Sequence, residues 1–157
     1  MLMELDRIMR DTSFMADAIA EARQAAAIGE VPVGCVIVHE GRVIAASYNL
    51  RESRQNALAH AELLAIDAAC KKLGSWRLSE CDLYVTLEPC PMCMGAIINS
   101  RIRRVVYGAA DPKAGCLGSL ADLTELPFNH KPEVHSGVCA DECGQMLRDF
   151  FGELRRK

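Results

Sequence analysis

The sequence predicts an α/β protein in which helices cover a mixed β-sheet. The first observation is that, after an N-terminal helical segment and a hairpin, short apolar strands alternate with segments of helical periodicity. The second is that 50% of the 157 residues are hydrophobic and 25% are charged, a composition typical of a globular protein with its own core. We therefore expect a single domain over residues 1–157.

The elements of the N-terminal half follow from periodicity and from the residues that end each segment. Asp11 or Thr12 can cap the first helix and Gly29 can stop it, while Gly74 can end the second. The expected elements are a helix over 12–29, a hairpin of strands over 33–38 and 43–48, a polar loop over 49–57 and a helix over 59–73.

The C-terminal half continues the alternation of strands and helices. Pro91 suits the first turn of a helix, where its missing N–H costs little, and the last segment is amphipathic. The expected elements are a strand over 83–87, a helix over 91–100, a strand over 104–107, a Gly-containing loop over 111–119, a short strand over 133–136 and a helix over 140–154.

Charge and hydropathy narrow the class of function. The formal net charge of −3 argues against a generally basic coat for nucleic acid, although basic residues outnumber acidic ones by five to three within residues 95–131. No apolar stretch approaches the ~18 residues that span a bilayer, and the first residues lack a signal-type apolar run. We expect a cytoplasmic protein, in which some of the eight cysteines bind metal or serve catalysis.

Two short motifs carry the chemistry: His60-Ala61-Glu62 and Pro89-Cys90-Pro91-Met92-Cys93. Cys90 and Cys93 are three residues apart at a helix start, so their sulfurs point the same way and the free N–H groups favour thiolates. With His60 they form a ligand set suited to Zn²⁺, and three protein ligands are typical of catalytic zinc, which keeps a fourth position for water.

Glu62 is the candidate general base of this site. Helix positions two apart point in directions that differ by about 200°, so Glu62 and His60 should not bind one ion together. We therefore expect Glu62 to shuttle protons beside the metal.

Other roles for the cysteines remain open at this point. Cys90 and Cys93 could be buried thiols or part of a closed structural zinc site, whereas a redox role would not need the His-x-Glu motif. Cys139 and Cys143 could form a second metal pair, although cysteine is often a small core residue. The other cysteines are interpreted as packing residues: Cys35, Cys70, Cys81 and Cys116.

The two motifs resemble those of the cytidine deaminase-like zinc hydrolases. The resemblance is closest to the bacterial tRNA adenosine deaminases and covers nearly the whole chain. The segments that carry it are 30–34, 48–49, 60–62, 83–108, 111–119, 129–130, 140–143 and 149–151.

This resemblance implies a three-layer α/β/α fold with a central mixed five-stranded sheet, and a homodimer. It implies hydrolysis of adenosine to inosine at the wobble position of a tRNA anticodon, in an arginine tRNA. His60, Cys90 and Cys93 would bind Zn²⁺ and Glu62 would transfer protons. The residues implied to contact the flipped base or the RNA are Asn49, the backbone of Ala61, Asp111, Lys113, Asn129, His130 and Phe150.

Two other functions are compatible with the same zinc chemistry. A deaminase of a free nucleobase, guanine or cytosine, is the first alternative, and Asn129-His130 speaks against it. A non-catalytic, zinc-stabilised partner subunit of another deaminase is the second, but such a subunit would be expected to lack Glu62.

Overall fold

The computed structural model describes residues 1–157 and is built on one five-stranded sheet with the order β2-β1-β3-β4-β5. β1 pairs antiparallel with β2 and β3, whereas β3–β4 and β4–β5 are parallel pairs. The strands are β1 (Gly34–His39), β2 (Arg42–Tyr48), β3 (Cys81–Leu87), β4 (Arg104–Ala109) and β5 (Glu133–His135). The predicted mixed five-stranded sheet is confirmed.

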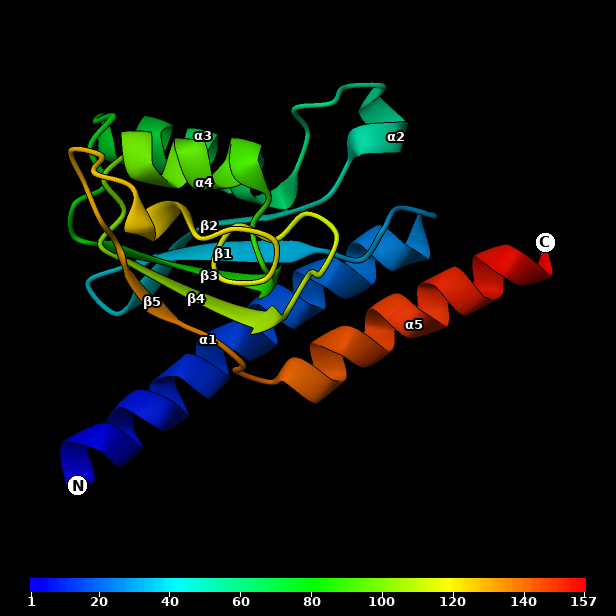
Figure 1. Ribbon diagram of the computed structural model, residues 1–157, viewed down its shortest axis with the longest axis horizontal. Coiled ribbons are helices and arrows are strands. Elements are labelled where there is room, and N and C mark those ends of the chain that lie inside the picture. Colours follow the sequence, from blue (N-terminus) through cyan, green and yellow to red (C-terminus); the bar gives the residue numbers. More distant parts are fainter.

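Helices cover both faces of this sheet, which confirms the predicted three layers (Figure 1). Helices α3 and α4 lie on one face, and the long helices α1 and α5 lie on the other. The helices are α1 (Leu2–Ala27), α2 (Arg51–Arg54), α3 (Ala61–Leu73), α4 (Pro91–Asn99), α5 (Ala140–Arg156) and a 3₁₀ turn, η1 (Leu123–Glu125). None of the helices has the length and apolar character that a bilayer crossing requires.

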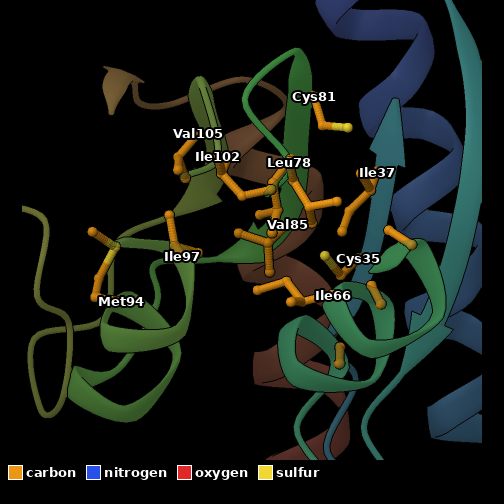
Figure 2. Packing of buried hydrophobic residues seen from close by; sticks show 14 of the residues in the cluster. Cys35, Ile37, Ile66, Leu78, Cys81, Val85, Met94, Ile97, Ile102 and Val105 are labelled. Atoms are coloured by element: carbon orange, nitrogen blue, oxygen red, sulfur yellow. The ribbon is translucent and has the colours of Figure 1, made fainter. Parts of the chain in front are cut away.

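The core consists mainly of aliphatic and cysteine side chains on the two sheet faces. Toward α3 and α4, Ile37 of β1 and Val85 of β3 pack with helix residues such as Ile66 and Ile97 (Figure 2). Cys35, Cys81 and Cys116 belong to this cluster, and Cys143 lies in the cluster on the opposite face. The interpretation of the first three as packing residues is thus confirmed, and all eight cysteines are free thiols.

The first helix begins about ten residues earlier than the sequence predicts. Leu2 to Arg10 contain no Gly or Pro, so nothing interrupts the helix before Thr12. Asp11 is not a cap: it is 3% exposed and accepts hydrogen bonds from the hydroxyl of Tyr84 and the guanidinium of Arg104. The predicted cap at this position is wrong because the carboxylate serves a buried ion pair.

Smaller differences lie near the sheet edge that carries the functional motifs. The expected polar loop after β2 contains the short helix α2, and α3 begins at Ala61 rather than at residue 59. β3 begins two residues earlier than expected, at Cys81. Because β1 runs opposite to β3, the start of β1 lies beside the end of β3. The first turns of α3 and α4 meet at this same end of the strands.

Candidate active site

His60, Cys90 and Cys93 converge where α3 and α4 begin. His60 is the N-cap of α3 and Cys90 the N-cap of α4, with Pro91 in the first turn of α4. The Nδ1 atom of His60 lies 3.7 Å from the sulfur of Cys90 and 3.5 Å from that of Cys93. One ligand atom from each residue lies within 4.8 Å of the others.

These separations fit a tetrahedrally coordinated cation. Bonds of about 2.3 Å to sulfur and about 2.0–2.1 Å to nitrogen place the two ligand atoms about 3.6 Å apart. The observed nitrogen–sulfur distances of 3.7 and 3.5 Å match this value. A borderline-soft imidazole with two soft sulfurs is also a donor set that Zn²⁺ accepts. The three residues can hold a metal ion.

The electrostatics of the cluster favour a thiolate at Cys90. A hydrogen bond from Cys93 and another from His60 outweigh burial and lower the pKa of Cys90 to about 4. The hydrogen bond to Cys90 and burial both raise the pKa of Cys93. The hydrogen bond with Cys90 also raises the pKa of His60. A divalent cation would favour thiolates at both cysteines.

Glu62 is buried beside this cluster, with 4% of its surface exposed. Burial is the largest cause that raises its pKa to about 7, and the negative charge of Cys90 adds to the shift. A carboxyl group that titrates near neutral pH can both accept and donate a proton under physiological conditions.

A cavity of about 220 Å³ opens over these groups. Its lining includes His60, Glu62 and Cys90, together with Asn49 and Asp111. Asn49 follows β2 and Asp111 follows β4, with β1 and β3 between them, so the two residues lie on opposite rims. Pockets that enclose a drug-sized ligand have volumes of roughly 300–1,000 Å³. This smaller cavity suits a group the size of a nucleobase and leaves the rest of a larger ligand outside.

The rims orient two of the predicted base- or RNA-contacting residues. The side-chain amide of Asn49 donates to the carbonyl of Val31 at 3.2 Å, and its oxygen accepts from the N–H of Arg51 at 3.2 Å. One N–H and one lone pair of this amide thus stay available for a ligand. Asp111 accepts from the backbone N–H of Lys113 at 3.0 Å, and Lys113 itself is exposed on the same loop.

The structure brings only some of the predicted RNA-contacting residues to this cavity. Ala61, Asn49 and Asp111 line it. Phe150 lies half-buried in a separate groove between α1 and α5, which it shares with Arg23 and Met146.

Asn129 and His130 lie at the opposite end of the parallel strands, where β3, β4 and β5 begin. They precede β5, which runs parallel to β3 and β4, so they cannot lie beside the end of β3. The Nε2 atom of His130 is 2.6 Å from the carbonyl oxygen of Ile102, and its ring lines a polar groove with Arg101 and Lys131. Their contact with RNA stays a prediction, and the cavity over His60 and Glu62 does not include them.

Sequence reasoning missed two buried carboxylates that hold the rims. Glu30, 1% exposed, accepts from the N–H groups of Glu52 and Ser53 at 3.1 and 2.6 Å. Glu88, 2% exposed, binds the loop that carries Asp111. In each case the sequence feature that could have indicated the carboxylate is an acidic residue next to an apolar segment. The two segments are Glu30-Val-Pro-Val and Val-Thr-Leu-Glu88.

The fold and this site define a hydrolytic deaminase of the cytidine deaminase-like class: a helix-covered mixed sheet with a His-x-Glu and a Pro-Cys-x-x-Cys motif at two helix starts. The sequence model of the MafB19-like deaminases matches residues 9–155. The tRNA-specific adenosine deaminase of Bacillus subtilis (strain 168) is 56% identical over 149 residues, which are 94% of this chain and 92% of the relative. The chain belongs to the MafB19-like deaminase family and, within it, to the tRNA-specific adenosine deaminases.

Solved structures agree with this placement. One from a study of A-to-I editing by tRNA:A34 deaminases at the wobble position superposes with a TM-score of 0.84 at 47% identity, covering 87% of this chain and 99% of that one. A guanine deaminase from Nitrosomonas europaea superposes with a TM-score of 0.72 at 25% identity, covering 88% and 82%. The chain is therefore more similar to the tRNA deaminase structure than to this free-base deaminase.

Proposed function

We propose that this chain hydrolyses adenosine to inosine at the wobble position of a tRNA anticodon, in an arginine tRNA, with one Zn²⁺ per chain. The observation that carries the proposal is the cavity of nucleobase size, which brings the His60, Cys90 and Cys93 cluster together with buried Glu62. The relatives at 56% and 47% identity support the choice of substrate.

The residues of the cavity divide the chemistry among them. His60, Cys90 and Cys93 would hold Zn²⁺, which when bound supplies Lewis-acid activation of a water molecule. Glu62 accepts one proton from the water that attacks C6 of the adenine and delivers it to N1. It then transfers the second water proton to N6, so the C6–N6 bond breaks, ammonia leaves and C6 keeps the oxygen. Its pKa of about 7 suits both directions of transfer.

Substrate binding would use the groups that the rims present. Asn49 and the backbone of Ala61 would hold the flipped base in the cavity. Asp111 and Lys113 would contact the RNA next to the flipped base. Three further residues would contact the RNA farther along: Phe150, Asn129 and His130. An anticodon loop suits this arrangement because its bases are already partly unstacked and cost less to extrude than a base in a duplex.

The chain would act as a cytoplasmic homodimer of one deaminase domain. Three large apolar side chains in the segment around η1 are at least half exposed: Leu120, Leu126 and Phe128. Leu123 of the same segment packs against the core cluster that α3 and α4 cover. On α4, a Cβ added at Gly95 would meet nothing within 4 Å. The variant Gly95→Arg therefore has open space for its Cβ in the single subunit, and its long side chain would obstruct a partner that packs on this helix.

Sedimentation at low micromolar concentration tests the dimer. We expect the wild type at twice the mass of the 17.2 kDa chain and Gly95→Arg at the mass of one folded chain. A wild type that sediments only as single chains would contradict the dimer.

Sequencing tRNA from cells with and without the protein tests the function, because reverse transcription reads inosine as guanosine. We expect A-to-G reads at the wobble position of an arginine tRNA to vanish without the protein and to return with the wild-type chain, but not with Glu62→Gln. Unchanged reads in the depleted cells would contradict the proposal.

A further inference from the structure

The loop from residue 110 to 119 is built around the carboxylate of Glu88. The Oε1 atom accepts from the N–H of Asp111 at 3.1 Å and from the hydroxyl of Ser119 at 2.5 Å. The Oε2 atom accepts from the N–H groups of Leu117 and Ser119 at 2.9 and 3.1 Å. One buried side chain therefore holds both ends of the loop.

The backbone packs directly on this carboxylate. A Cβ added at Gly115 would lie 2.3 Å from Cδ of Glu88, so only a glycine allows the loop to approach this closely. The N–H of Cys116 donates to the carbonyl of Pro89 at 2.9 Å, and the N–H of Glu88 donates to that of Ala109 at 2.9 Å. The loop is thus fixed against the segment that leads into Cys90.

This loop forms the rim of the cavity opposite Asn49. Asp111 and Ala114 line the cavity, and Lys113 stands exposed between them. The position of Lys113 relative to a base in the cavity therefore depends on how the Asp111 end of the loop is held.

We propose that Glu88 is a positioning residue for RNA recognition. Through the N–H of Asp111 it holds residues 111–114 at the rim of the cavity, where Lys113 can contact the RNA backbone beside the target base. The proposal rests on the function proposed above. Glu88 itself borders the cavity, but its four hydrogen bonds to the loop already satisfy its carboxylate, so it acts through the loop.

The variant Glu88→Gln releases one end of the loop selectively. Its amide oxygen can keep the N–H groups of Leu117 and Ser119, and its NH₂ can donate to the hydroxyl of Ser119. The N–H of Asp111 then faces an NH₂ group and loses its acceptor. The matched control Ser119→Ala removes a hydroxyl at the far end of the loop and keeps the carboxylate on Asp111.

The experiment measures binding of a labelled anticodon stem-loop to the zinc-loaded chain between 50 and 200 mM salt, with Glu62→Ala in every sample to prevent turnover. We expect Glu88→Gln to weaken binding about 10-fold, the scale of one lost buried hydrogen bond. It should also reduce the salt slope by about 0.7, the value for one phosphate contact on a single strand.

Lys113→Ala should reduce the slope equally, and adding it to Glu88→Gln should change the slope no further. Ser119→Ala should match the parent. Gly115→Ala, which displaces the loop from an intact Glu88, should reproduce the effect of Glu88→Gln and serves if that variant does not fold.

Four outcomes would overturn the inference. They are a parent-like affinity and slope in Glu88→Gln and Gly115→Ala, a lowered melting temperature with an unchanged slope, loss of zinc from Glu88→Gln, and additive slopes with Lys113→Ala. A parent that binds no stem-loop would overturn the proposed function and this inference with it, whereas a binding parent with an unaffected Glu88→Gln overturns the inference alone.

Discussion

Replacing Asp11 by alanine should destabilise the protein strongly although Asp11 lies far along the chain from both motifs. Its carboxylate accepts from the hydroxyl of Tyr84 at 2.7 Å and from both Nη atoms of Arg104, and the two charged side chains are 5% and 6% exposed. Asp11→Ala leaves the guanidinium buried, with Asp82 at 3.9 Å as its nearest acidic group.

Removing one partner of a buried ion pair costs about 3–5 kcal/mol of unfolding free energy. For a chain of this size each kcal/mol lowers the melting temperature by roughly 2–4 °C, so we expect a decrease of about 6–20 °C. Thermal unfolding followed by circular dichroism measures it. The control is Asp67→Ala, which breaks an exposed pair with Lys71 at 2.8 Å and should cost no more than about 1 kcal/mol. A decrease in melting temperature no larger than that of the control would contradict a stabilising role for the buried pair of Asp11 and Arg104.

The same pair predicts how stability depends on pH. Burial raises the pKa of Asp11, but hydrogen bonds from Arg104 and Tyr84 and the charge of Arg104 outweigh it and lower the pKa below its ordinary value of 3.8. Stability from this group is therefore full above about pH 4 and is lost as the pH falls through the lower folded-state value. Asp11→Ala should lose less stability than the wild type over that acid range.

Three further predictions concern the site and its support. The double variant Cys90→Ala, Cys93→Ala should lose its zinc in metal analysis, and stoichiometric zinc in it would contradict the ligand assignment. Glu62→Gln should keep zinc and fold while kcat falls about 10²–10⁴-fold, and loss of zinc would instead make this carboxylate a ligand. Gly108→Ala would place a Cβ 2.5 Å from the buried sulfur of Cys143 and should lower the free energy of unfolding by about 1–3 kcal/mol. Gly152→Ala, whose Cβ meets nothing within 4 Å, should not lower it. Equal melting temperatures of the two variants would contradict this prediction.

Local patterns in the sequence predicted most of the fold and the residues of the His60, Cys90 and Cys93 cluster. The period of the helices, the hairpin and the short apolar strands identify their elements because each signal lies within a few residues. His60, Cys90 and Cys93 could be named because their helix starts and ligand types are visible in two short motifs, and the structure brings all three together.

What the sequence did not predict depends on partners far away in the chain. Asp11 looks like a cap, and only folding places Arg104, 93 residues later, against it. Glu88 carries no signal of its role because its donors begin at Asp111, 23 residues away. The distance of His130 from the cavity follows from the parallel pairing of β4 and β5, which a single sequence does not specify.

The choice between a tRNA substrate and a free base is tested by turnover of a synthetic anticodon stem-loop, compared with free adenosine, adenine, guanine and cytosine. The purified, zinc-loaded wild type is incubated with each substrate at equal concentration, and inosine and released ammonia are measured. We expect the wobble adenosine of the stem-loop to be converted far faster than any free base or nucleoside. Faster conversion of free guanine or cytosine would contradict the claim and support the free-base alternative.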